Sequence, residues 1–352
     1  MLVPGVGPRI ARALLERFGT ASRVLKARAA ELRQVEGVGP KLAARIVRAR
    51  AELAPEAELE LCQQHGVRLI ALADAEYPKP LKEIPDPPPL LYVRGTLAPE
   101  DGLALAVVGS RRCTPYGMRV AERLAGSLAR VGLTVVSGLA RGIDAAAHRG
   151  ALKAGGRTLA VLANGLAEVY PPEHAELARE IAASGALLSE MPMRHCPLPD
   201  LFPRRNRLIA GLCLGVVIVE AAPRSGSLST ARHALEQGRE VFAVPGPIDS
   251  LSSRGCHALI RDGARLVETI DDILEELGPR FRNAPPSEAA ATTERPEAAL
   301  KLSEPERALL GHLDDLPRAA DELIARTGLA AAQVMATLSV LEMRRLIRRV
   351  PG

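Results

Sequence analysis

The chain has 352 residues, and its 46 Lys or Arg against 41 Asp or Glu give a formal net charge of +5. That length allows one large hydrophobic core with one or two small domains. The mild positive charge favours a polyanionic partner. No signal peptide and no apolar run of about 18 residues is present, so we expect a cytoplasmic protein that does not span a membrane.

The number and spacing of the cysteines and the small number of aromatic residues further limit the classes of protein to which the chain could belong. Five cysteines stand far apart without a C-x-x-C pair, which indicates free thiols in a reducing compartment. With no Trp, four Phe and four Tyr, the chain lacks the aromatic platforms on which OB-folds and RNA-recognition sheets stack bases. A bound nucleic acid would therefore be held mainly by its backbone.

Residues 1–55 contain an internal repeat. A Gly-Val-Gly turn at 5–7 precedes a helical stretch over 9–18, and a second such turn at 37–39 precedes a stretch over 41–51. The repeat resembles a paired helix-hairpin-helix (SAM-like) domain, whose turn amides contact DNA phosphates. Packing against other proteins is the alternative role of this module, since the helix expected before the first hairpin is missing.

Residues 56–279 are predicted to form the main domain. An apolar strand over 67–72 leads into a segment so rich in proline that it should exclude helix and run extended. From residue 103 strands and helices alternate, which predicts an α/β fold, an extended Rossmann-like, mostly parallel sheet with helices on both faces. Strands are expected at 103–108, 133–136, 158–162, 186–188, 215–219, 241–244 and 265–267, with helices that include 143–154, 175–183, 204–212, 229–237 and 257–262.

The C-terminal part of the chain has a different composition. Residues 280–301 are rich in Pro, Ala, Thr and Glu without an apolar period, which predicts a flexible linker. Residues 302–352 show three short helical patterns, at 304–313, 319–327 and 331–341, and then a basic tail. This size and order are typical of a winged-helix-like domain.

The turn after the first strand of the alternating region holds Gly109, Ser110, Arg111 and Arg112. A nicotinamide or flavin site would place G-x-G-x-x-G here and an acidic residue at the end of the next strand. Neither is present, so the dinucleotide interpretation fails. Two arginines beside a helix start favour phosphate oxygens, and a nucleic-acid backbone is the leading candidate ligand.

Three further turns are expected at the same edge of the sheet, because right-handed crossovers bring the ends of parallel strands together. Apart from Phe202, their candidate residues are glycines, arginines, serines and one asparagine, which suit an anion site. They are Ser137 and Gly138 in the first turn, Phe202, Arg204, Arg205, Asn206 and Arg207 in the second, and Ser225, Gly226 and Ser227 in the third.

Acidic and histidine side chains near these turns raise the alternative of catalysis. Asp144 and His148 lie four residues apart on one helix face, yet no third ligand follows at a metal-binding spacing, and capping and core packing account for both. Glu190 and Glu220 end strands and leave a carboxylate-dependent hydrolase open. We predict no catalytic residues, no metal site and no cofactor.

Six ordered motifs together resemble the DNA-processing protein A family (DprA, also called Smf). They are Val108 to Arg111, Ser137 to Asp144 with His148, Tyr170-Pro171, Ser189-Glu190, Phe202 to Leu212, and Val244 to Gly246. The resemblance covers about residues 75–268. It implies an extended Rossmann domain that binds single-stranded DNA through its phosphates, with Gly109, Ser110, Arg111, Ser137, Gly138, Phe202, Arg205, Asn206 and Arg207 in the pocket and Ser225 to Ser227 at its edge.

The resemblance also implies a role without catalysis. The protein would be a cytoplasmic homodimer that protects incoming single-stranded DNA and loads a RecA-type strand-exchange recombinase in natural transformation, with single-stranded-DNA-binding protein as a further partner. The helix expected at 330–341 carries no basic residue, which argues against duplex binding by the terminal domain.

Two other functions stay open at this point. The first is a nucleotide-processing Rossmann enzyme of the phosphoribohydrolase type, although the sequence at 223–228 departs from the P-G-G-x-G-T loop such enzymes use. The second is a duplex-DNA adaptor that works through its end domains.

Overall fold

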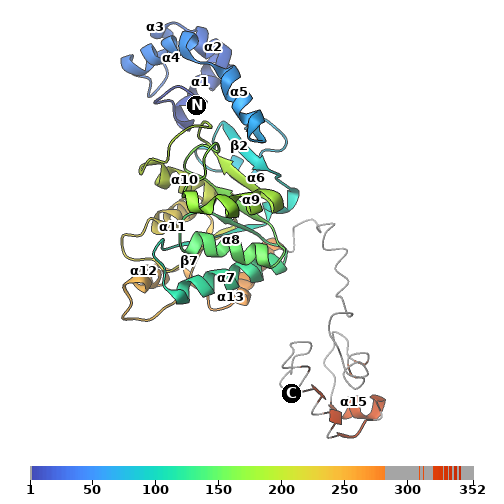
Figure 1. Ribbon diagram of the computed structural model, residues 1–352. Coiled ribbons are helices and arrows are strands. Elements are labelled where there is room, and N and C mark those ends of the chain that lie inside the picture. The colour runs from blue at the N-terminus through green and yellow to red at the C-terminus, as the bar shows by residue number, and fades with distance from the viewer. Residues whose placement is uncertain are drawn as a thin grey trace. The chain divides into compact units, whose positions relative to one another are not determined.

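The computed structural model describes residues 2–281, 309, 312, 320–327, 329–331, 333–334, 337–338 and 341 (Figure 1). The chain divides into two compact units, Met1–Pro285 and Pro286–Gly352. The first unit holds a small helical domain and a large α/β domain, and the second is described by itself below.

The N-terminal domain repeats one turn twice. Gly5 and Gly37 adopt positive φ values of 92° and 82°, a conformation open to glycine, and each turn runs directly into a helix whose first residue is proline. Apolar residues from all its helices form one core that includes Leu14, Leu32 and Ile46. The helices are α1 Pro8–Phe18, α2 Ala21–Lys26, α3 Ala29–Leu32 and α4 Pro40–Glu52. The predicted pair of hairpins is present.

The large domain is built on a nine-stranded sheet in the order β1-β2-β6-β5-β4-β3-β7-β8-β9. Strands β3 to β9 are mutually parallel, and β2 pairs antiparallel with both β1 and β6. The bounds are β1 Val67–Ala71, β2 Leu90–Gly95, β3 Ala104–Gly109, β4 Thr134–Ser137, β5 Thr158–Val161, β6 Ala186–Ser189, β7 Gly215–Val219, β8 Glu240–Ala243 and β9 Arg265–Leu266. The predicted mostly parallel Rossmann-like sheet is confirmed.

Helices cover both faces of this sheet, as its wholly buried central strands require. One face carries α5 Pro55–Gln64, α7 Pro115–Arg130, α8 Ile143–Lys153, α9 Ala175–Ser184 and α13 Ile270–Phe281. The other carries α6 Lys79–Lys82, α10 Leu201–Gly211, α11 Ser227–Glu236 and α12 Arg254–Arg261. Short 3-10 turns lie at η1 Pro99–Gly102, η2 Pro172–His174 and η3 Leu251–Ser253.

Two expectations about helices need correction. The proline-rich segment contains the one-turn helix α6, although its prolines were expected to exclude helix, because Pro80 stands in the first turn where a missing N–H breaks no bond. Helices α10, α11 and α12 each begin two or three residues before their predicted starts. The residues missed in α11 and α12 are mostly polar, small or basic and carry no apolar period, whereas those missed in α10 are Leu201, Phe202 and the helix-starting Pro203.

The second unit is described in part. Helix α15 Ala320–Thr327 coincides with the second predicted helical pattern. Leu309, Leu323, Val334 and Leu341 are buried together, and Leu338 packs against them, so the apolar spacing at 334–341 faces inward as predicted. The linker was predicted at 280–301, but its first two residues belong to helix α13 Ile270–Phe281. The rest of it, from residue 282, and the basic tail lie outside the described residues. Across both units, no described helix is long and apolar enough to cross a membrane.

Candidate nucleic-acid interface

The predicted turns converge at the point where the strand order reverses. The chain builds β4, β5 and β6 on one side of β3 and then returns to place β7 on the other side. In open α/β sheets the crevice outside the carboxyl ends of such strands is the usual ligand site. We call this carboxyl-end edge of the sheet the rim.

The loop that carries Arg111 and Arg112 is fixed to the end of β7. A Cβ on Gly109 would lie 1.8 Å from the Val219 carbonyl oxygen, so only glycine fits. The Ser110 amide donates to the Glu220 carbonyl oxygen at 2.8 Å, and the Thr114 amide donates to the Glu220 carboxylate at 2.7 Å. Glu220 therefore positions the loop, which is a role the sequence did not disclose.

The loop after β4 is held by its own helix. Gly142 has a φ of 76° and packs against the Ser110 carbonyl, and the Ile143 amide donates to that same oxygen at 3.2 Å. The Asp144 carboxylate accepts hydrogen bonds from the Gly138 and Ala140 amides at 3.1 and 3.4 Å. Burial raises the pKa of Asp144, and the charge of Arg205 opposes that shift.

Arg205 is a buried part of this framework. Its guanidinium donates a hydrogen bond to the carbonyl oxygen of Gly138 in the β4 loop at 2.7 Å. It donates another to the carbonyl oxygen of Val161 at the end of β5. A Cβ on Gly138 would lie 2.4 Å from the same guanidinium, so the loop and the arginine fit closely. Burial lowers the pKa of Arg205 to about 10, against the opposing effect of Asp144.

The exposed surface of the rim is an aromatic ring flanked by arginines. The Arg111 guanidinium lies 4.6 Å from the centre of the Phe202 ring, a cation–π distance, and Arg205 lies 6.0 Å from it on the buried side. Tyr170 packs beside the ring at a centroid distance of 6.1 Å. Tyr170 was not predicted as a site residue, and the scarcity of aromatics in this chain is the feature that would have drawn attention to it.

The third turn joins the first residues of α11. Asn206 accepts from the Arg205 guanidinium at 3.2 Å and donates its amide to the Gly226 carbonyl at 3.2 Å, so α10 fixes this turn. The hydroxyls of Ser225 and Ser227 lie 2.8 Å apart at the amino end of the helix. Helix amino ends attract anions, so this end of the crevice suits a phosphate group.

Arg207 is buried and bound to groups of the proline-rich segment and of the end of β6. Its guanidinium donates to the Asp86 carbonyl at 2.9 Å and to the Glu190 carboxylate at 2.5 Å, and the Arg207 and Glu190 side chains are both nearly fully buried. Burial raises the pKa of Glu190, and Arg207 acts against that shift. This group of charges fastens α10 and β6 to the proline-rich segment.

The predicted residues differ in their exposure to solvent. Ser110, Arg111, Arg112, Phe202, Arg204, Ser225 and Gly226 keep accessible surface, and so in part does Gly109. Ser137, Gly138, Arg205, Asn206, Arg207 and Ser227 are buried. Arg224, exposed beside Ser225, is a further basic residue of the rim that sequence reasoning passed over.

The titratable groups near the rim form contacts that support the fold. His148 is completely buried, its Nδ1 lies 2.7 Å from the Thr158 hydroxyl, and burial lowers its pKa to about 3. Among the described residues no three His, Cys, Asp or Glu side chains are grouped as metal ligands.

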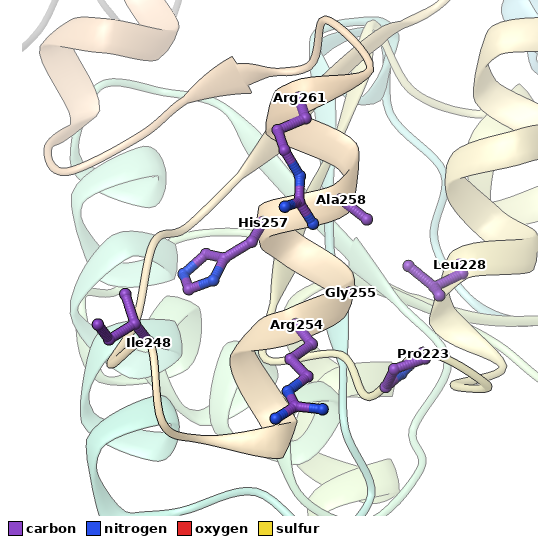
Figure 2. Close-up of a pocket in the computed structure, with 8 residues that line it drawn as sticks. All are labelled: Pro223, Leu228, Ile248, Arg254, Gly255, His257, Ala258 and Arg261. Atoms are coloured by element: carbon purple, nitrogen blue, oxygen red, sulfur yellow. The ribbon is translucent and has the colours of Figure 1, made fainter.

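A hollow of about 560 Å³ lies beside α12 (Figure 2). Figure 2 shows Arg254, His257 and Arg261 along the helix and Ile248 and Leu228 on either side of it. Its lining contains no carboxylate, hydroxyl or thiol side chain. The hollow therefore offers no hydroxyl or thiol nucleophile and no carboxylate base.

Residues 68–278 match the family described as DNA recombination-mediator protein A. The chain belongs to this family. Residues 286–352 match the DprA winged helix domain, and residues 2–52 match the SAM-like helix-hairpin-helix tandem. The order of these three matches confirms the predicted fold class from end to end.

Related proteins and structures agree with the assignment. Protein Smf of Synechocystis is 36% identical over 99% of this chain and 95% of its own length, and Protein Smf of Escherichia coli is 43% identical over 84% and 79%. The DprA structure from Streptococcus pneumoniae is 37% identical and superimposes with a TM-score of 0.69 over 77% of this chain and 94% of its own. The Helicobacter pylori structure is 32% identical with a TM-score of 0.55 over 60% and 97%, and its description concerns that protein's single-stranded DNA binding mode.

Proposed function

We propose that this member of the recombination-mediator family binds single-stranded DNA by its phosphate backbone at the rim. The observation that carries the proposal is the contact of the exposed Arg111 guanidinium with the Phe202 ring, with Arg112 and Arg204 as further exposed basic residues close to these two in the chain. Arg111 is stacked on the ring, and none of these three exposed guanidiniums forms an ion pair with a carboxylate among the described residues. Guanidinium groups left free beside an aromatic face suit phosphates and an unstacked base.

The cellular role follows from the family and is part of the same proposal. The chain would protect incoming DNA and load a RecA-type recombinase during natural transformation, as a cytoplasmic homodimer that also works with single-stranded-DNA-binding protein. The single-stranded DNA named for the Helicobacter pylori relative supports the ligand.

The proposal includes the absence of catalysis. Glu220 holds the β3 loop, Asp144 holds the β4 loop, and Glu190 is paired with Arg207, so each carboxylate near the rim has a structural task. Incubation with nucleoside monophosphates tests the alternative of a phosphoribohydrolase, and release of free base would refute a purely binding role.

The deciding experiment compares oligo-dT with a duplex of equal length in fluorescence anisotropy. Wild type should bind oligo-dT more tightly, and Phe202→Ala should weaken that binding by about 1–3 kcal/mol, the range for one stacked base. Leu235→Ala, a truncation of an exposed side chain on α11 that is 63% accessible, is the matched control. Equal affinity for both DNA forms would instead favour the duplex-DNA adaptor.

A further inference from the structure

A basic groove runs along the outer side of α7, away from the rim. Its charged lining residues are Arg119, Arg123 and Arg130 of α7, Lys153 of α8, and Glu122, and its volume is about 370 Å³. Helices α7 and α8 lie side by side over this part of the sheet (Figure 1). No residue of this groove belongs to the crevice described above.

The arginines form a single line on the helix. Positions 119, 123 and 130 are separated by four and seven residues, which places them on one face of an α-helix together with Gly126. At 1.5 Å per residue, the axial distances between successive arginines are about 6 Å and about 10 Å. These distances are about those of two and three nucleotides of a stacked strand.

The charges of this line are available to a ligand. Among the described residues Arg119 has no hydrogen-bond partner, Arg123 donates to the Glu268 carbonyl at 3.4 Å, and Arg130 donates to the Ser127 hydroxyl at 3.0 Å. Glu122 is the one carboxylate in the lining, and it is paired with Lys153. The groove is therefore strongly positive, because no carboxylate among the described residues is paired with its three arginines.

Some exposed arginines of the same domain do form ion pairs. Arg68 pairs with Glu76 at 2.7 Å, Arg179 with Glu176 at 2.6 Å, and Arg265 with Glu275 at 2.9 Å. Such pairs neutralise one another on the surface and attract little. Arg119, Arg123 and Arg130 form no such pair among the described residues.

The floor of the groove allows a ligand strand to approach the two helices closely. Gly126 and Gly150 bring the two helices together, since a Cβ on Gly150 would lie 2.2 Å from the Glu122 carbonyl oxygen. Ala154 supplies the one apolar side chain of the lining. An acidic protein would need an apolar centre to its interface, whereas a phosphodiester backbone needs charge and room alone.

Continuity with the rim identifies the strand that would lie here. Helix α7 starts at Pro115, directly after the loop that carries Arg111 and Arg112, and Arg119 follows within its second turn. We propose that single-stranded DNA leaving the crevice continues along the α7 groove, where Arg119, Arg123 and Arg130 bind its phosphates. This rests on the proposed function and extends the binding site from the rim to the flank of the domain.

The test uses the full chain and two lengths of oligo-dT, about 6 and about 20 nucleotides, since the shorter fills a single site and the longer reaches beyond it. The combined substitution Arg119→Gln, Arg123→Gln and Arg130→Gln should leave Kd for the short oligonucleotide unchanged. For the long one, Kd should rise about tenfold or more, and the slope of log K against log salt should become shallower by about 2, at about 0.7 per lost contact.

Two matched variants separate contact from overall charge. Arg68→Gln, Arg179→Gln and Arg265→Gln remove the same charge from paired arginines and should bind the long oligonucleotide as wild type does. The combined substitution Arg119→Lys, Arg123→Lys and Arg130→Lys keeps the charge and should retain the wild-type salt slope. Thermal midpoints of all variants should match that of wild type, because the substituted side chains are exposed.

Several results would overturn the inference. The inference is wrong if the glutamine variant binds the long oligonucleotide as wild type does, or if the charge-matched control loses as much affinity for it. It is also wrong if the glutamine variant loses affinity only for duplex DNA, or only for an acidic protein. Failure of wild type to bind the short oligonucleotide would instead count against the rim as the DNA site. The two hypotheses are thereby tested separately.

Discussion

Arg111 and Arg205 both lie near the Phe202 ring, but one is exposed and the other buried, and they have different roles. Arg111 is exposed, its guanidinium 4.6 Å from the ring centre, and no carboxylate pairs with it among the described residues. We predict that Arg111→Ala weakens oligo-dT binding by about 1–3 kcal/mol, the scale of a lost charge-assisted contact. Unfolding free energy should change by less than about 0.5 kcal/mol. Anisotropy and urea unfolding on the same variant check both values.

Arg205 is only 5% exposed, so its loss should act on the framework first. Arg205→Ala leaves the carbonyls of Gly138 and Val161 without donors and removes the positive charge beside buried Asp144. We predict a loss of stability of about 2–3 kcal/mol, with weaker DNA binding as a consequence of a displaced β4 loop. A variant as stable as Arg111→Ala would show that the guanidinium is not bound as described.

His148 gives the protein a pH-dependent term in its stability. Burial lowers its pKa to about 3, whereas an unfolded histidine titrates near 6.5, so the folded state holds the neutral ring. The stabilisation is complete above about pH 6.5 and is lost as pH falls from there towards 3. The unfolding free energy of wild type minus that of His148→Gln should therefore fall by up to about 1.4 kcal/mol per pH unit in this window. His65→Gln, a change at a partly exposed position, is the control, and a flat difference would contradict the buried neutral ring.

At the scale of elements, the strands were predictable and the roles of the arginines were not. Runs such as 104–109 and 215–219 are apolar throughout because both faces of the sheet are covered, and this signal lies within each segment. Arg204, Arg205 and Arg207 are local neighbours that look alike in sequence. Their different burial is decided by the carbonyls of Gly138 and Val161 and by Asp86 and Glu190, which come from distant segments.

The ion pairs of Arg207 should stabilise the position of α10. Arg207→Met leaves the Glu190 carboxylate buried without its partner, and its second oxygen already lacks a hydrogen bond among the described residues. We predict a loss of about 3–5 kcal/mol in unfolding free energy at neutral pH, measured by urea titration. Adding Glu190→Gln removes the stranded charge and should recover part of that loss. No recovery in the double variant would mean that Arg207 acts mainly through Asp86.

Across the whole molecule, helix-hairpin-helix, Rossmann-like and winged-helix parts offer three places where DNA could bind. The exposed arginines of the rim and of α7 belong to the first unit, and so do both glycine turns. In the second unit, Val334, Leu338 and Leu341 of the predicted third helix face a buried cluster, and the sequence at 330–341 holds no basic residue to read a groove. The charge balance therefore favours single-strand binding by the first unit alone.

This leads to a prediction for a chain that ends at residue 285, the boundary between the two compact units. The shortened protein should retain the affinity of the full chain for oligo-dT within about 1 kcal/mol, because every arginine assigned to the DNA path remains. Its salt slope should also be unchanged, since the slope counts phosphate contacts and none of those is removed. Residues 286–352 alone should bind duplex DNA weakly, through backbone contacts of the basic tail at 344–349 rather than through bases. A shortened protein that stays folded by thermal unfolding yet loses more than about 2 kcal/mol of oligo-dT affinity would move the principal DNA contacts from the rim to the C-terminal unit.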